Sequence, residues 1–176
     1  MKIFVIRHGK TELNEKHLIN GHLEDTLIPE GIAQVEAVAS SVPKSIKHIY
    51  SSSSLRAEQT AKILSKSLDA KITLHDELKE VSFGTLEGTD WTKDVKEKHR
   101  SLQYDWHAHN GESVEDVTKR LLKILETIKA SNGDGEALVV THGGIIRLLY
   151  FLEHKTLLEK LDNALLFEFD IDKMLG

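Results

Sequence analysis

Two histidines in this sequence follow short apolar segments in the same way. Arg7 and His8 follow the apolar residues of FVIRHG, and His142 follows those of LVVTHGG, with a glycine directly after each histidine. A neutral imidazole can attack phosphorus near neutral pH without a separate base. The planar fork of arginine can hold two phosphate oxygens at once. These residue types in this repeated pattern indicate phosphoryl chemistry, although either histidine taken alone would be read as a packing residue.

A third basic residue follows another apolar segment. The stretch YSSSSLRAEQTA places Arg56 just beyond this segment and near the start of a predicted helix. In open α/β sheets, ligands bind beyond the carboxyl ends of the strands, so the two histidines and two arginines are expected at one edge. Two guanidinium groups and the N–H groups of helix starts suit an anion with several oxygens, of which phosphate fits best. A flexible serine loop and a solvated arginine would explain this stretch if it stood alone.

The elements that must position these residues alternate along the chain. Short apolar runs rich in β-branched residues predict strands at residues 2–6, 46–50, 72–74, 137–140 and 165–171. Apolar residues at helical spacing predict helices at 29–41, 57–68, within 111–130 and at 145–152, with a short one around 91–99. Ser113 is expected to cap the helix within 111–130, with Asp116 three residues further on. This alternation predicts an α/β sheet with helices on both faces.

Composition limits the class of protein. The 176 residues suffice for a single domain with a hydrophobic core, and 40% hydrophobic with 29% charged residues is ordinary for a globular protein. The net charge of −5 gives no reason to expect nucleic acid or an anionic membrane as a partner. The absence of cysteine excludes thiolate catalysis and disulfides. No apolar stretch could span a bilayer and Arg7 interrupts any signal-peptide pattern, so we expect the chain in the cytoplasm.

Six stretches of the sequence resemble the histidine phosphatase superfamily, also called the phosphoglycerate mutase-like family. They are RHGKTELN at 7–14, NGHLEDTLIPEG at 20–31, YSSSSLRAEQTA at 50–61, LKEVSFGTLEG at 78–88, GESVEDVTKR at 111–120 and VVTHGG at 139–144. They stand in the family's order and span nearly the whole chain. The resemblance implies a phosphoglycerate mutase-like α/β fold: a single domain over residues 1–176 with a mostly parallel, mixed sheet and a small cap insertion at roughly 76–110.

The resemblance also implies roles for individual residues. His8 matches the family's nucleophile, which becomes a phosphohistidine, and Glu80 matches its proton donor. The residues that match groups contacting the phosphate or the substrate are Arg7, Asn14, Gly21, Arg56, His142 and Gly143. Of these, Arg7, Arg56 and His142 belong with His8 and Glu80 to the implied catalytic set. No metal or other cofactor is implied, because arginines and histidines replace the cation that other phosphoryl-transfer enzymes use.

The proton donor has two candidates. A leaving alkoxide needs a proton, and a carboxylic acid can supply it if nearby negative charge, such as the substrate phosphate, raises its pKa. Glu87 stands only seven residues after Glu80. We favour Glu80, because it precedes the bend expected at Phe83 and Gly84 and matches the family position. Charge in the transition state spreads over the equatorial phosphoryl oxygens, so fixed positive groups are expected to supply the rest of the catalysis.

The expected reaction is hydrolysis of a phosphate monoester, with a small phosphorylated metabolite as the partner. The segment between Gly88 and Gly111 and the tail are both short, whereas mutases of the family that use a bisphosphate primer tend to have longer ones. This favours a phosphatase over a bisphosphoglycerate-dependent phosphoglycerate mutase. A phosphoprotein phosphatase stays open, and the complete catalytic set argues against a non-catalytic phosphate-binding module.

Substrate choice is expected to lie in the cap. The candidate residues are Trp91, Lys93, Lys96, Tyr104, Trp106 and His109, although packing of the insertion against the core would explain them equally well. His107 and His109 could suggest a metal site, but no third ligand has suitable spacing. The sequence leaves the natural substrate and the oligomeric state open.

Overall fold

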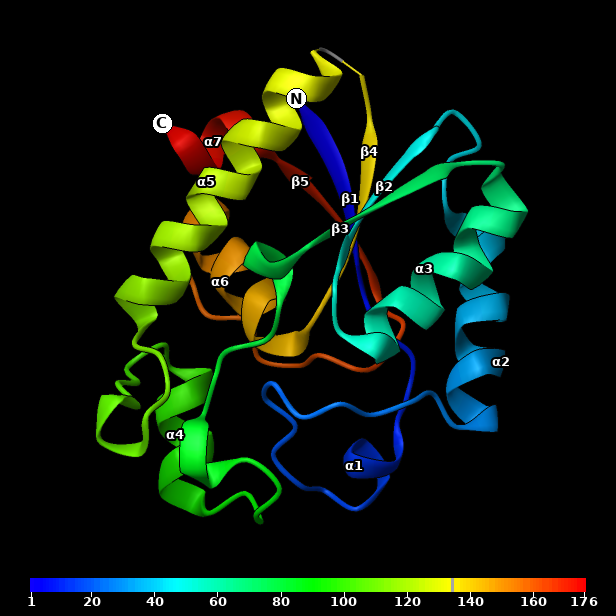
Figure 1. Ribbon diagram of the computed structural model, residues 1–176. Helices are drawn as coiled ribbons and strands as arrows, with labels where there is room; N and C mark the ends of the chain where they lie inside the picture. Colours follow the sequence, from blue (N-terminus) through cyan, green and yellow to red (C-terminus); the bar gives the residue numbers. More distant parts are fainter. Residues whose placement is uncertain (134) are drawn as a thin grey trace.

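The computed structural model describes residues 1–133 and 135–176, and within them five strands form one sheet (Figure 1). The order across the sheet is β3-β2-β4-β1-β5. The strands are β1 (Lys2–Arg7), β2 (His48–Ser52), β3 (Lys71–His75), β4 (Ala137–Thr141) and β5 (Leu166–Asp170). The first four pair in parallel, whereas β5 lies antiparallel to β1 at one edge. The expected mixed, mostly parallel α/β sheet is therefore confirmed.

Helices cover both faces of this sheet (Figure 1). One face carries α2 (Pro29–Val38) and α3 (Leu55–Leu68), and the other carries α5 (Val114–Asn132), α6 (Gly143–His154) and α7 (Ile171–Leu175). Side chains of alternate residues of β1 point to opposite faces of the sheet. Ile3 and Val5 join the core that includes α5 and α6, while Phe4 and Ile6 join the core that includes α2 and α3. None of the helices in the described residues is long and apolar enough to cross a membrane.

The insertion between β3 and α5 contains one helix, α4 (Lys93–Arg100), and several short turns. The shorter segments of the structure are α1 (Glu12–Glu15) and the 3₁₀ turns η1 (Ala39–Ser41), η2 (Asp76–Leu78), η3 (Gly84–Leu86) and η4 (His107–His109). Within the insertion, Trp106 stacks on Phe83 and on Tyr104, with ring centroids 5.7 and 5.9 Å apart. Tyr104 and Trp106, two of the specificity candidates, are both buried and pack together within the insertion.

Several boundaries differ from those expected, and three of them concern residues of the site. β2 extends to Ser52 rather than ending near residue 50, because Ser51 and Ser52 are buried and continue the pairing with β3. α3 begins at Leu55, so Arg56 lies in its first turn. Gly143 begins α6 directly and forms no separate turn. The helices α1 and α7 were not predicted, because four and five residues are too few to show a periodic pattern.

The register of β1 against β4 brings the two histidines together. Arg7 pairs with Thr141 in this parallel ladder, so His8 and His142 follow at the same edge of the sheet. The backbone N–H of His8 donates to the carbonyl of Thr141 at 3.0 Å and extends the ladder by one bond. The expected convergence of the two strand ends is confirmed by this pairing.

Candidate active site

His8 lies one residue beyond β1 and is almost fully buried, at 2% exposure. Its Nδ1 is 2.8 Å from the carbonyl oxygen of Gly9. A carbonyl can only accept a hydrogen bond, so Nδ1 carries the proton and Nε2 keeps its lone pair. Burial lowers the pKa of His8 well below its ordinary value, and the charges of Arg56 and Arg7 lower it further. The ring is therefore neutral at physiological pH and offers Nε2 as a nucleophile.

His142 forms the N-cap of α6 and lies beside His8, with the two ring centroids 5.1 Å apart. Its Nε2 is 2.8 Å from the hydroxyl oxygen of Ser52. Nδ1 is buried and has no hydrogen-bond partner among the described residues. A serine hydroxyl can donate to Nε2, which leaves an Nδ1–H able to donate to an oxygen of a ligand. Burial lowers the pKa of His142, as it does for His8, so this ring is neutral as well.

Two arginines, the half-buried Arg7 and the buried Arg56, place positive charge beside the histidines. Arg7 donates from Nη1 to the carbonyl of Leu161 at 3.2 Å. Arg56 donates from Nη1 and Nη2 to the carbonyls of Leu23 and Gly21, each at 2.8 Å. Gly21, expected beside the substrate, thus holds a terminal nitrogen of Arg56 through its own carbonyl. Burial lowers the pKa of Arg7 to about 10, so its guanidinium is still charged at neutral pH.

The Nε atoms of both arginines are buried and have no partner within the described residues. A buried donor without an acceptor costs about 1–3 kcal/mol. Together with Nδ1 of His142, these two atoms form a set of unpaired nitrogens whose residues stand at the end of β1 or follow β2 and β4. An anion with several oxygens would satisfy all three. The terminal nitrogens of Arg56 already hold the loop, so its contact with such an anion starts from Nε and not from the expected terminal fork.

The carboxylate of Glu80 is held at the start of α6. Both of its oxygens lie 3.1 Å from the backbone N of Gly144, whose N–H points to them. Gly144 has no room for a side chain, because a Cβ there would overlap Oε1 of Glu80 and lie 2.8 Å from Cε1 of His99. Burial lowers the pKa of Arg7 and of Arg56, and the negative charge of Glu80 partly offsets that effect. Glu80 therefore lies near both arginines. The residue that it binds, Gly144, stands two positions after His142.

Glu87, the rival candidate, holds a loop. Its Oε1 accepts from the backbone N–H of Phe83 at 3.0 Å and so closes the turn around η3. The same carboxylate fills the space beside Gly21, where φ is +49° and a Cβ would overlap it. No hydrogen bond joins Glu87 to α6 in the part of the chain that the structure describes. This position favours Glu80 as the acid next to the histidines.

Asn14 is connected to the centre through a residue that sequence reasoning missed. Its Oδ1 accepts from the backbone N–H of Thr11 at 3.2 Å and from Nδ2 of Asn163 at 3.1 Å. Asn163 also donates to the carbonyl of His8 at 3.1 Å. It lies in an irregular segment before β5, where no local pattern marks it. Gly143 lies against Arg7, since a Cβ on it would be 3.5 Å from Nε of that arginine.

A clamp on α5 fixes the loop that carries Glu80, and sequence reasoning missed it too. Arg120 donates from Nη1 to the carbonyls of Glu77 and Lys79, at 2.7 and 2.8 Å, and from Nη2 to the carbonyl of Glu80 at 3.0 Å. The carboxylate of Glu112 accepts from Nε and Nη2 of this arginine at 2.8 and 2.9 Å. The only hint in the sequence is that Glu112 and Arg120 belong to the stretch GESVEDVTKR.

A family model, curated relatives and solved structures that match the chain all belong to one family of proteins. The family model for the histidine phosphatase superfamily (branch 1) matches residues 3–172. The phosphoglycerate mutase-like protein 4 of Arabidopsis thaliana is 33% identical over 161 residues, which cover 85% of this chain and 69% of the relative. The metal-independent phosphoserine phosphatase of the same plant is 29% identical over 159 residues, covering 85% and 67%. The crystal structure of phosphoglycerate mutase from Thermus thermophilus superposes with a TM-score of 0.73 at 28% identity, covering 94% of this chain and 87% of that one.

Proposed function

The chain belongs to the histidine phosphatase superfamily, and we propose that it hydrolyses small phosphate monoesters through a phosphohistidine on His8, with Glu80 as proton donor. The observation that carries this proposal is the set of buried, unpaired nitrogens beside His8, namely Nε of Arg7, Nε of Arg56 and Nδ1 of His142. Each can donate to an oxygen of a phosphoryl group that faces Nε2 of His8. The similarity to a protein named as a phosphoserine phosphatase supports the reaction class.

In the first step, Nε2 of His8 attacks the phosphorus of the ester. The N–P bond forms as the P–O bond to the alcohol breaks, and the alcohol oxygen takes the proton of the Glu80 carboxyl. The arginines and His142 stabilise the negative charge that spreads over the three equatorial oxygens. The bond from Nδ1 of His8 to the carbonyl of Gly9 keeps the ring in the tautomer that this attack requires.

In the second step, water attacks the phosphorus of the phosphohistidine. The N–P bond breaks and its electrons return to Nε2, while the carboxylate of Glu80 takes a proton from the attacking water. Inorganic phosphate leaves, and both side chains return to their starting protonation states. Because the two arginines and the ring N–H of His142 supply the charge stabilisation, the proposed cycle needs no metal ion.

Two structural features favour this reaction over its alternatives. A mutase would use the same phosphohistidine but must keep water away from it, and the insertion between β3 and α5 contains only one eight-residue helix among its described residues. That small cover favours hydrolysis. The depth of His8, at 2% exposure, favours a small ester over a phosphate on the surface of a protein.

Phosphate release from a panel of small esters, measured in buffer containing EDTA, tests the proposal. O-phosphoserine comes first in the panel because of the similarity to a metal-independent phosphoserine phosphatase. We expect hydrolysis that survives EDTA, and with 3-phosphoglycerate plus a bisphosphate primer we expect free phosphate. Loss of all activity that Mg²⁺ restores would contradict the metal-free cycle. Efficient formation of 2-phosphoglycerate would instead identify a mutase.

Replacement of Arg120 by methionine is expected to slow the hydrolysis of esters with poor leaving groups more than that of esters with good ones. Without the clamp the loop under Glu80 loses its fixed position, and we expect kcat/KM for an alkyl phosphate to fall about tenfold. The loss for p-nitrophenyl phosphate should be much smaller, because its phenolate leaves without a proton. Lys119→Met is the matched control, since Lys119 is exposed on the same helix. Equal losses for both esters would mean that Arg120 only stabilises the fold.

A further inference from the structure

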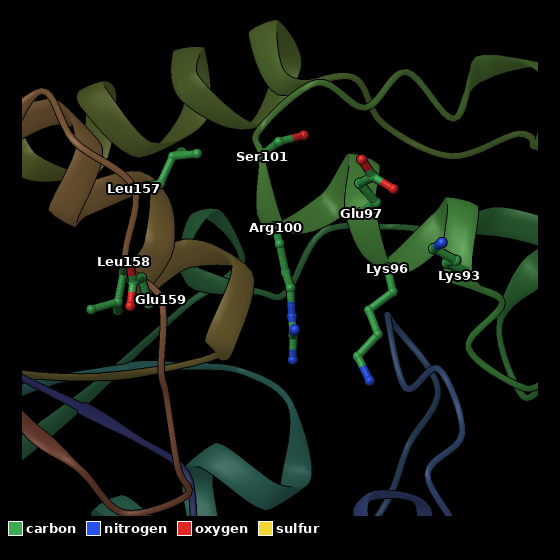
Figure 2. A pocket seen from close by; sticks show the side chains of 8 residues that line it. All are labelled: Lys93, Lys96, Glu97, Arg100, Ser101, Leu157, Leu158 and Glu159. Carbon is green, nitrogen blue, oxygen red and sulfur yellow. The ribbon is translucent and has the colours of Figure 1, made fainter.

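The segment that joins α6 to β5 borders two different spaces. Its residues 157–159 line a pocket of ≈ 480 Å³ opposite α4 (Figure 2). Further along the segment, the carbonyl of Leu161 accepts from Nη1 of Arg7 at 3.2 Å. Two residues later comes Asn163, which is half-buried and hydrogen-bonds to the backbone of His8. The later part of this segment therefore borders the proposed phosphate site.

The amide nitrogen of Asn163 donates two hydrogen bonds. Its Nδ2 lies 3.1 Å from the carbonyl oxygen of His8 and 3.1 Å from Oδ1 of Asn14. Both partners are acceptors, and the second is identified as an oxygen because it also takes the backbone N–H of Thr11 at 3.2 Å. The orientation of the Asn163 amide is therefore fixed by its surroundings, since an oxygen in the place of Nδ2 would face two other oxygens.

The same contacts decide which end of the Asn14 amide is free. Asn14 is the third residue of α1, and its Oδ1 completes a capping box with the N-cap residue Thr11. With the N–H of Thr11 and Nδ2 of Asn163 both on Oδ1, the oxygen end of this amide is occupied. These are the only hydrogen bonds of the Asn14 side chain within residues 1–133 and 135–176, so Nδ2 keeps both of its protons free. A free donor is thus connected through one side chain to the backbone of His8.

We propose that Asn163 is a positioning residue for phosphate binding, which holds the Asn14 amide with Nδ2 turned towards a phosphoryl group at His8. The inference rests on the proposed function, because it extends the anion site that this function requires. A donor that is held in place before the anion arrives does not have to be ordered on binding, so more of its hydrogen-bond energy is available for affinity. Without Asn163, the Asn14 amide keeps its bond to Thr11 but loses the contact that aligns it with His8.

Calorimetric titration with inorganic phosphate tests the inference without any need for turnover. Asn14→Ala removes the donor, and we expect the Kd for phosphate to rise about tenfold or more, the value of a hydrogen bond to a charged group. Asn163→Ala only loosens the donor and should raise the Kd about fivefold. In the double variant the Kd should stay within about twofold of that of Asn14→Ala, because Asn163 acts through Asn14. The carbonyl of His8 keeps a partner in all three variants, the backbone N–H of Ala164 at 3.4 Å.

Variants of the same shape separate positioning from a role in folding. Asn14→Asp keeps both hydrogen bonds at its oxygen end, as Asp116 does in the capping box of α5, and loses only the free donor. Its Tm should stay that of the unchanged protein while the Kd for phosphate rises about tenfold or more. Asn163→Asp sets a carboxylate oxygen against two acceptors and should raise the Kd at least as much as Asn163→Ala. The matched control is Asn132→Asp, because Nδ2 of Asn132 also donates twice, at 2.7 Å each, but from the last residue of α5 at the other end of the sheet (Figure 1).

Several results would overturn the positioning role while phosphatase activity stands. They are an unchanged Kd in Asn163→Ala, fully additive effects in the double variant, and a Kd that rises equally in the Asn132→Asp control. A rise confined to Asn163→Asp would overturn it too, because the introduced negative charge would then explain the weaker binding of an anion. If the unchanged protein binds no phosphate and hydrolyses no ester, p-nitrophenyl phosphate included, the proposed function fails and the inference fails with it.

Discussion

The His8→Ala variant is expected to lose turnover by on the order of 10⁴-fold or more and to form no covalent intermediate. Nε2 of His8 is the nitrogen left with a free lone pair, because Nδ1 donates to the carbonyl of Gly9. Rapid acid-free quenching after mixing with ³²P-labelled ester should give labelled protein from the unchanged enzyme. The label should be lost in acid and retained in base, as a phosphoramidate bond requires.

Two variants make the His8 result specific. His154→Ala removes an exposed histidine at the end of α6 and should leave labelling unchanged. His142→Ala should slow labelling, because it removes a phosphate donor, without preventing attack by His8. Label that persists in His8→Ala would place the nucleophile elsewhere, with His142 as the first alternative, since its ring centroid is 5.1 Å away.

The second large effect is expected for Glu80→Gln, and its size should depend on the leaving group. Gln still accepts the N–H of Gly144 but has no proton to give to an alcohol. We expect kcat for an alkyl phosphate to fall by about 10² or more, the range of a lost general acid. For p-nitrophenyl phosphate the loss should be far smaller, and the phosphohistidine should still form from this ester. Slower breakdown of that intermediate would show that the same carboxylate also activates water.

Glu87→Gln is the matched control for this result. Its carboxylate closes the turn around η3 through the N–H of Phe83, so the variant should lose activity modestly and equally for both esters. If Glu80→Gln behaves in that way and Glu87→Gln shows the dependence on the leaving group, the two roles are reversed. The predicted effect of Arg120→Met depends on the same result, because Arg120 holds the backbone of Glu80 and should matter only if Glu80 is the acid.

Much of this site could be predicted from the sequence because it is built on a simple repeat of local structure. Each of the two apolar strands β1 and β4 is followed by a histidine and a glycine, and parallel neighbours in one sheet end at the same edge. Because Arg7 pairs with Thr141, the next residues, His8 and His142, lie side by side with their rings in contact. The same rule accounts for Arg56, although the serines before it concealed the true length of β2.

The supporting residues could not be predicted, because their contacts join distant and irregular segments. Asn163 reaches the carbonyl of His8 across 155 residues of chain, and Arg120 reaches the carbonyl of Glu80 across 40. Neither contact is marked in the sequence by a periodic pattern or by a characteristic spacing of residues.

The central position of β1 in the sheet affects how the chain can fold during its synthesis on the ribosome. β1 is translated before the other strands, yet its two neighbours in the sheet are β4 and β5, which come last (Figure 1). Its apolar residues must therefore wait unpaired until about 130 residues have followed, and pairing across such a separation is slow. His8, the proposed nucleophile, gains the hydrogen bond from its N–H to Thr141 only when β4 has arrived. A nascent or truncated chain that ends before β4 would carry His8 without the strand that pairs beside it, and the apolar residues of β1 would stay exposed to aggregation.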